Sequence, residues 1–213
     1  MSDSPPERDL EWTETGIEGI WRYVNRLWRM VSEPSVVLPP PGSAVPASLS
    51  ASASAIRRAA HKTIAAVTDD LDKFRFNRAV ARIRELTNAL DELPSTDPGA
   101  PAVLREGLET LARLIGPMMP HLAEEMWQEL GGCGLLAEQP WPSFDPALTR
   151  DDQVTLAVQV NGKLRATLEV PRDTAAAAVE NAALALPQVM RWLDGQAARK
   201  VIVVPNRIVN IVA

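Results

Sequence analysis

The stretch HKTIAAVTDDLDKFRFNRAVARIRELTNAL, residues 61–90, contains two helical patterns separated by one break. Apolar residues such as Ile64 and Val67 recur at three- and four-residue steps, the spacing of one buried helix face. The pattern lapses at the lysine and phenylalanine that follow Asp72 and then resumes. It predicts two consecutive helices, at about residues 56–72 and 76–90.

Three further helices are predicted around this pair. One covers residues 14–31, one covers 102–115, and a short one ends at Leu130 after the break at Gly116-Pro117. The first has an apolar stripe at Ile17, Ile20, Val24, Leu27, Trp28 and Val31. Four or five antiparallel helices predict a bundle, with Met118, Met119, Met126 and Trp127 as core-filling residues.

Residues 32–55 interrupt the helical pattern. They are rich in Pro, Ser, Ala and Gly, a composition that cannot supply a core stripe. We expect a mobile loop there, between the first and second helices.

The hydrophobic period changes from 3.6 to 2 near Arg150, which predicts a β-hairpin around Asn161-Gly162. A three-residue loop, Val160 to Gly162, would pair Val158 with Leu164 and Leu156 with Ala166, so that every apolar residue faces the core. A two-residue Asn-Gly loop would instead mix apolar and charged residues on one face. The first register therefore predicts that four polar residues share the open face: Thr155, Gln159, Lys163 and Arg165.

The rest of the chain predicts two helical segments and two more strands. The helices cover about 174–186, after an Asp173 cap, and 189–193, before Gly195; the strands are 200–204 and 207–212. The predicted fold class is mainly α followed by α+β. A helical bundle at 1–150 precedes a small β-β-α-β-β domain at 151–213, with one sheet face covered by helix.

Composition excludes several classes of function. The 213 residues contain one cysteine, Cys133, and two histidines sixty positions apart, which argues against a disulfide and against a metal site. No membrane span or signal peptide is recognisable, so we expect a cytoplasmic protein without membrane contact. No catalytic residues are identifiable, because neither paired carboxylates, a triad nor a phosphate loop can be found.

The net charge of −5 argues against indiscriminate binding to nucleic acid, including DNA. Any nucleic-acid site must be local. Residues 1–150 contain 15 basic and 21 acidic side chains, and the remainder contains 7 and 6, so the tail is the more basic part. Two arginine stripes stand out at helical spacing: Arg22, Arg26 and Arg29 with Asn25 between them, and Arg75, Arg78 and Arg82. From spacing alone, each stripe is best explained as a solvated helix face.

Seven segments, taken in order, resemble bacterial leucyl-tRNA synthetases. They are SDSPPERDLEWTETGIEG (2–19), WRYVNRLWRMV (21–31), the stretch 61–90, PMMPHLAEEMWQELG (117–131), WPSFD (141–145), VQVNGKLRATLEVP (158–171) and KVIVVPNRIVNIV (200–212). Related isoleucine and valine enzymes generally end in cysteine-ligated zinc or a coiled-coil arm, which this sequence lacks.

The resemblance implies a class I anticodon-binding bundle followed by a flexibly tethered domain that reaches the tRNA elbow and the long variable arm. It also implies that the sequence starts just after the KMSKS loop. Neither KMSKS nor HIGH is present, so we expect no catalysis, and expect ATP and Mg²⁺ only in a catalytic part outside this chain. The implied partners are tRNA, specifically leucine tRNA, and that catalytic part.

The same resemblance turns the basic residues into candidate tRNA contacts. In the bundle these are Arg22, Asn25, Arg26 and Arg29 and, as weaker candidates, Arg75, Arg78 and Arg82; near the elbow they are Lys163, Arg165, Lys200 and Arg207. The alternative hypothesis is a helical interaction module whose basic stripes bind an acidic protein partner.

Overall fold

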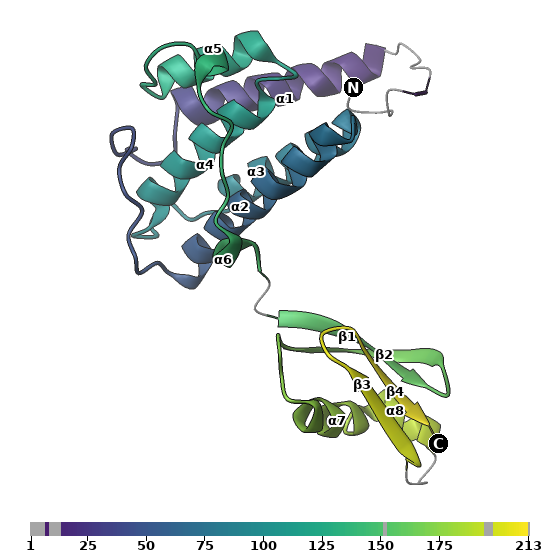
Figure 1. Cartoon of the computed structure of the whole chain (residues 1–213). Coiled ribbons are helices and arrows are strands. Elements are labelled where there is room, and N and C mark those ends of the chain that lie inside the picture. Colours follow the sequence, from purple (N-terminus) through teal and green to yellow (C-terminus); the bar gives the residue numbers. More distant parts are fainter. Residues whose placement is uncertain (1–6, 9–13, 151–152, 194–197, 213) are drawn as a thin grey trace. The chain divides into compact units, whose positions relative to one another are not determined.

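The structure is a computed structural model that describes residues 7–8, 14–150, 153–193 and 198–212. The chain divides into two compact units, Met1–Thr149 and Arg150–Ala213. We call them the helical unit and the small unit (Figure 1). The fold class predicted from the sequence, mainly α followed by α+β, is confirmed.

The helical unit is built from five longer helices and two short ones among its described residues. Their bounds are α1 (Glu14–Ser32), α2 (Ala51–Asp72), α3 (Phe76–Asp91), α4 (Ala100–Ile115), α5 (Pro120–Glu129), the 3-10 turn η1 (Leu136–Glu138) and α6 (Pro146–Thr149). Each of the longer helices starts or ends within a few residues of the bound that periodicity predicts. The aromatic and sulfur side chains of α5 are core, as predicted, because Met126 and Trp127 are buried.

The core of this unit lies mainly between α2, α3 and α4. Its largest fully buried side chains include Ile83, Leu86, Leu90, Leu108 and Leu111. The apolar face of α1 is buried only over its second half: Leu27 and Val31 are buried, whereas Ile17 and Ile20 are exposed. The sequence pattern predicts all of these positions as core, so the prediction is wrong for the first half of this helix.

The loop between α1 and α2 is shorter than predicted, and it contributes to packing. Helix α2 begins at Ala51 because the Ser50 hydroxyl accepts a hydrogen bond from the Ala53 N–H at 3.0 Å, which caps the helix. Ala53 is fully buried, and Val36 and Leu49 pack against the core. The prediction of a loop over 32–55 is therefore wrong from Ala51 onward, where α2 begins.

The small unit is a four-stranded mixed sheet with two helices on one side (Figure 1). Its elements are β1 (Gln153–Val160), β2 (Lys163–Pro171), α7 (Ala176–Leu184), α8 (Pro187–Leu193), β3 (Lys200–Val204) and β4 (Ile208–Val212). The strand order is β2-β1-β4-β3, with β1 parallel to β4 and the other neighbours antiparallel. Leu156, Val158, Val209 and Ile211 form the centre of its core, under Val179 and Val189 of the helices.

The register of the first hairpin differs from the prediction. The turn is the two-residue Asn161-Gly162 loop, in which both residues have positive φ (51° and 76°), and Val160 lies opposite Lys163. The pairing shifts by one residue at Val158–Gln159, so that Arg165 is the extra residue of a β-bulge. This bulge restores the match of apolar residues farther along, because Leu156 pairs with Leu168.

Two further expectations about the small unit need correction or remain outside the description. Asp173 does not cap α7, whose N-cap is Ala175; its N–H and carboxylate instead bond to the Asn206 side chain at 2.9 and 2.7 Å. The predicted end of the second helix before Gly195 lies outside the described residues. So do the first six residues of the chain, on which the expectation of no signal peptide rests. Among the helices that the structure does describe, none is both long and apolar enough to cross a bilayer.

Candidate nucleic-acid interface

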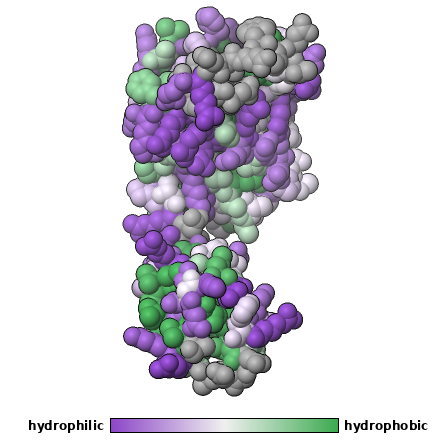
Figure 2. Space-filling view, turned by 90° about the vertical axis from the view of Figure 1, so that its right-hand side faces the viewer, coloured by the Kyte–Doolittle hydropathy of each residue, from purple (hydrophilic) through white to green (hydrophobic). Residues whose placement is uncertain are grey.

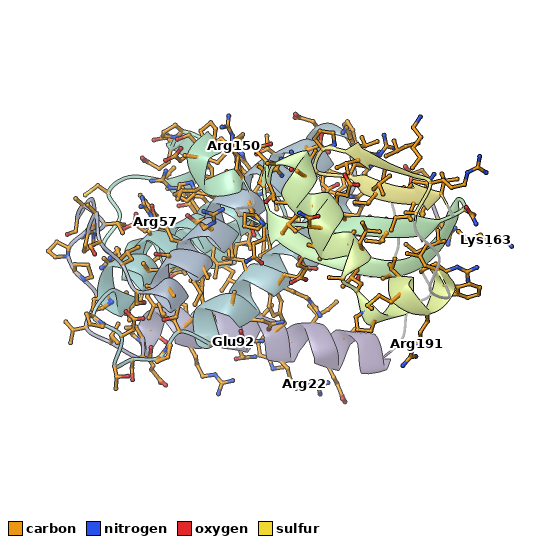
Figure 3. The ribbon with its side chains drawn as sticks, turned by 90° about the horizontal axis from the view of Figure 1, so that it is seen from below. Arg22, Arg57, Glu92, Arg150, Lys163 and Arg191 are labelled. Carbon is orange, nitrogen blue, oxygen red and sulfur yellow. The ribbon has the colours of Figure 1, made fainter. Side chains whose placement is uncertain are left out.

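The polar side chains of α1 do not form one continuous stripe. Arg22 is exposed and lies 3.8 Å from the Glu18 carboxylate on its own helix, an arrangement that screens little of its charge. Asn25 turns back and donates to the Trp21 carbonyl at 2.8 Å. In Figure 3 the Arg22 side chain extends away from the ribbon. Arg22 is therefore placed where a phosphate could reach it.

Arg26 has a different role, because it ties α1 to the end of α3. Its Nε donates to Asp91 at 2.9 Å and its Nη1 donates to Asn88 at 2.8 Å. Arg29 is exposed and borders, together with Arg26, an open hollow of about 280 Å³. Glu33 and Asp91 line the same hollow, so this part of the surface carries charges of both signs.

The second arginine stripe is organised around one buried carboxylate. Asp70, at the end of α2, is 1% exposed; its Oδ1 lies 3.2 Å from Arg78 Nε and its Oδ2 lies 3.9 Å from Arg82 Nε. The sequence pattern places Arg75, Arg78 and Arg82 on the side away from the core. That prediction is wrong for Arg78 and Arg82, which lie on the flank of α3 that faces α2.

Arg75 precedes α3 and is exposed, and its charge contributes to lowering the pKa of Asp69 on the adjacent helix. The main cause of that lowered pKa is the hydrogen bond from Lys73. The turn between α2 and α3 therefore gathers Lys73 and three arginines around three acids, Asp69, Asp70 and Asp72. Arg82 also lies 3.7 Å from Glu85, so the four cations of this corner are matched by four acids.

Two other arginines lie on aromatic rings inside the bundle, which spacing alone does not reveal. The Arg84 guanidinium lies 4.6 Å from the centroid of the Tyr23 ring, and that of Arg113 lies 5.0 Å from the Trp127 ring. Burial raises the pKa of Tyr23, although its hydrogen bond with Thr87 and the charge of Arg84 oppose the rise. These contacts hold two partly buried guanidinium groups against the aromatic side chains of the bundle.

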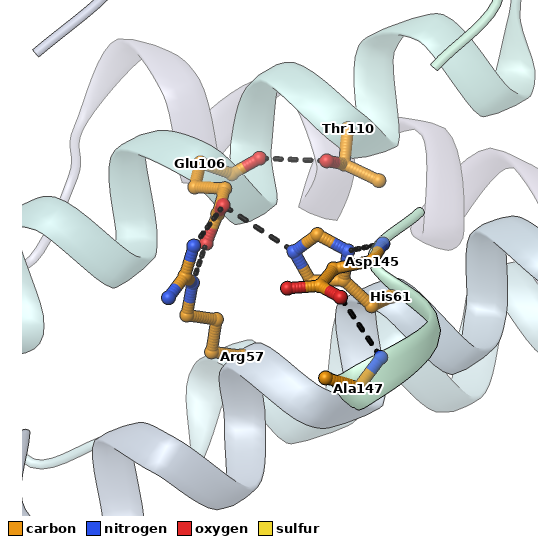
Figure 4. Close-up of polar contacts among 6 residues, drawn as sticks. All are labelled: Arg57, His61, Glu106, Thr110, Asp145 and Ala147. Atoms are coloured by element: carbon orange, nitrogen blue, oxygen red, sulfur yellow. Dashed lines mark hydrogen bonds and ion pairs between the residues drawn. The ribbon is translucent and has the colours of Figure 1, made fainter. Parts of the chain in front are cut away.

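A polar cluster joins α2, α4 and the segment before α6 (Figure 4). The His61 Nδ1 accepts the Asp145 backbone N–H at 3.0 Å, so the ring proton is on Nε2, which lies 3.4 Å from Glu106. Arg57 Nε donates to the other Glu106 oxygen at 2.9 Å. Burial would raise the pKa of Glu106, but the hydrogen bonds from His61 and Arg57 outweigh it and lower the pKa.

This cluster fastens a chain segment rather than forming an active site. Trp141 Nε1 also donates to Thr68 at 2.9 Å, so the stretch from Trp141 to Asp145 is attached to α2 at two points. Both ring nitrogens of His61 and both carboxylate oxygens of Glu106 have partners within the cluster. We therefore assign His61 and Glu106 a structural role that the sequence did not indicate.

In the small unit, the bulge places Arg165 on the helix-covered side. Its guanidinium carbon lies 3.4 Å from the centroid of the Trp192 ring in α8. The prediction that Arg165 shares the open face with Gln159 is therefore wrong, and Leu164, predicted as core, is 60% exposed instead. Lys163 is exposed beside the turn, and Figure 3 shows its side chain extending from the end of the hairpin.

The remaining two predicted contacts lie at opposite ends of the sheet. Lys200 pairs with Val212 at the C-terminal end of β4. The Asn161-Gly162 turn lies at the same end, because the Asn161 N–H donates to the Ile211 carbonyl, so Lys200 and Lys163 share that end of the sheet. Three strand spacings, roughly 14 Å, separate the β2 and β3 backbones. The Arg207 carbonyl bonds to Ala157, near the middle of β1, which places Arg207 at the other end. The structure therefore does not unite the four predicted elbow residues in one site.

The exposed cations described above could donate hydrogen bonds to phosphates. Figure 2 shows one face of the helical unit covered mainly by hydrophilic side chains, while hydrophobic side chains reach the surface of the small unit. No group of three or more His, Cys, Asp or Glu side chains that could hold a metal ion occurs within the described ranges. A hollow of about 270 Å³ lined by residues such as Arg113, Pro117, Glu124 and Trp141 contains no cluster that resembles a catalytic site.

Three comparisons with known proteins agree. Residues 53–180, from α2 into α7, match the family model described as the anticodon-binding domain of tRNA ligase. Leucine–tRNA ligases from Paramagnetospirillum magneticum and Rhodospirillum rubrum are 66% and 58% identical over 212 residues. These matches cover 100% of the chain but 24% and 25% of the relatives, so the chain spans about a quarter of their length.

A solved structure is also similar over nearly the whole chain. It is the Agrobacterium radiobacter K84 agnB2 LeuRS in a ternary complex with tRNA and LeuAMS. The TM-score is 0.80 at 30% sequence identity, and the match covers 99% of this chain and 28% of that one.

Proposed function

Because the chain belongs to the anticodon-binding domain family of tRNA ligases, we propose that it is the tRNA-binding part of a leucine–tRNA ligase. It would position leucine-specific tRNA for leucylation by a catalytic part outside these 213 residues. The similarity over 99% of the chain to a synthetase solved with tRNA carries this proposal.

The exposed cations supply the contacts. Arg22 and Arg29 on α1, with the arginines at the α2–α3 turn, can donate to phosphates, and Lys163, Arg165 and Lys200 can do so in the small unit. Phosphate contacts fix the position and register of a nucleic acid without reading its sequence. Holding the tRNA in place would direct its acceptor end into a distant active site, which lowers the entropic part of the barrier.

We expect no aminoacylation by this chain alone. The sequence contains neither a KMSKS nor a HIGH motif. ATP and Mg²⁺ would bind to the catalytic part, which is the second expected partner.

Binding measurements with two tRNAs would test this function. We expect the purified chain to bind leucine-specific tRNA more tightly than a tRNA with a short variable arm. We expect affinity for both to fall as salt rises, because bound phosphates release counterions. Replacing Lys163 and Arg165 together by Ala should weaken the preference. Equal or undetectable binding of both tRNAs at low salt would contradict the proposal and favour an acidic protein partner.

A further inference from the structure

An exposed tryptophan is held in a cationic surface at one corner of the small unit. Trp192, on α8, is 54% exposed, and the Arg165 guanidinium lies on its ring at 3.4 Å. An exposed indole with a guanidinium on its ring presents an apolar surface and hydrogen-bond donors to solvent together.

The β-bulge is what creates this contact. An uninterrupted β2 would alternate strictly, so that Arg165 and Ala166 would lie on opposite faces. The extra residue instead lets both lie on the side that α8 covers. The chain thus departs from regular pairing at the one position that brings an arginine onto an exposed indole.

The Arg165 guanidinium is oriented by stacking. Its Nε is buried and has no hydrogen-bond partner among the described residues. The indole therefore holds the group flat, and the outer Nη atoms are the donors left for a ligand. Lys163 and Arg191 are exposed on the adjoining turn and helix, and Figure 3 shows both side chains extending away from the ribbon.

We propose that Trp192 and Arg165 form a stacking site for an unpaired nucleobase of the bound RNA, with Lys163 and Arg191 beside it to contact the flanking phosphates. This inference rests on the function proposed above and extends it from phosphate contacts to contact with a base. A base offers a flat apolar face next to a negative charge, which matches an exposed ring surrounded by cations. Arg165 covers one face of the indole, and a base can stack on its other face or on the guanidinium plane.

Substitutions of Trp192 distinguish stacking from packing. Affinity for leucine-specific tRNA should be highest with Trp at position 192, lower in Trp192→Phe and lowest in Trp192→Leu. We expect Trp192→Leu to weaken binding about tenfold, as for the loss of one stacked base. Because this change removes no charge, the slope of log affinity against log salt should stay constant. Arg165→Gln should weaken binding and also make the slope shallower. Binding to an RNA duplex without unpaired bases should change little in the Trp192 variants.

Ile202→Ala provides the matched control. Ile202 is an exposed apolar residue of the same unit, but it lies on the sheet face opposite the helices, because its neighbours Val201 and Val203 pack on the core. We expect no loss of affinity there. If the chain binds tRNA but Trp192→Leu binds as tightly as Trp192→Phe, the stacking site is wrong while the proposed function stands. The same conclusion follows if Ile202→Ala loses as much tRNA affinity as Trp192→Leu. If the unaltered chain does not bind tRNA, the proposed function itself fails.

Discussion

Asp70 Oδ1 lies 3.2 Å from Arg78 Nε across the turn between α2 and α3. The carboxylate is 1% exposed, whereas the Arg78 side chain is half exposed. The buried Asp70 carboxylate thus positions the Nε of Arg78, while the rest of this half-exposed side chain is open to solvent. This pairing, extended by Arg82 at 3.9 Å, decides where the α3 arginines can present their donors.

Removing the Asp70 charge should destabilise the helical unit. In Asp70→Asn, two arginines lose their shared counter-ion, and we expect the free energy of unfolding to fall by about 1–2 kcal/mol. This value is less than for a fully buried pair, because solvent screens the arginines. The urea midpoint measures it.

The neighbouring acid serves as the control for this change. Asp69 is exposed and pairs with Lys73 on its own helix, so Asp69→Asn should leave the urea midpoint unchanged. Equal effects of the two substitutions would show that burial of Asp70 contributes nothing to the interaction.

Glu106 should make the helical unit sensitive to acid. Its pKa is lowered from 4.5 in the folded state, because hydrogen bonds from His61 and Arg57 exceed the effect of burial. A carboxyl with a lowered folded pKa stabilises the fold above the unfolded value and loses that contribution as pH falls through the folded value. Stability supplied by Glu106 should therefore be complete above pH 4.5 and disappear below it.

The Glu106→Gln variant isolates this contribution. At pH 7 we expect it to unfold more easily than the unaltered chain by about 1 kcal/mol, since the half-buried ion pair with Arg57 is lost. The difference between their urea midpoints should shrink as the pH is lowered below 4.5. Burial raises the pKa of the neighbouring Glu109, and the charge of Glu106 adds to that rise, so Glu106→Gln should also ease ionisation of Glu109. A gap that persists unchanged to pH 3 would contradict this account.

Arg26 and Arg22, four residues apart, should respond differently to loss of charge. Arg26→Gln breaks the bonds to Asp91 and Asn88 that attach α1 to α3, and should cost about 0.5–1 kcal/mol of stability. Arg22→Gln should leave the urea midpoint unchanged and make the salt dependence of tRNA binding shallower by about one phosphate contact. The opposite pattern would mean that Arg26, not Arg22, faces the RNA.

The hairpin shows where reasoning from the sequence stops. Alternation identifies both strands, and Asn161-Gly162 identifies the turn. The prediction of a three-residue loop in place of a two-residue one depends on the assumption that every apolar residue of the hairpin is buried. In the structure Leu164 is exposed instead, and a bulge at Arg165 places the arginine on the Trp192 ring. A partner so far away in sequence leaves no local signal.

The arginine stripes fail for a related reason. Spacing on a helix fixes which side chains share a face, but not what packs beside that face. Asp70 is one of three acids between residues 69 and 72, and only the α2–α3 turn shows that it, and not its neighbours, is buried beside Arg78. By contrast, the apolar periods predict the bounds of α3 and α4, the end of α2 and the buried faces of all three well, since burial of those faces is what holds the helices together.

Gly132 should be intolerant of any side chain. A Cβ built there would lie 2.1 Å from the Trp127 ring, which is 7% exposed and carries the Arg113 guanidinium. Gly132→Ala must displace this ring and should lower the free energy of unfolding by about 1–3 kcal/mol, the usual cost of overpacking. Cys133→Ala, at the adjacent exposed position, should have no effect. If urea denaturation gives the same midpoint for both variants, the ring moves without cost and Trp127 is not a fixed part of the core.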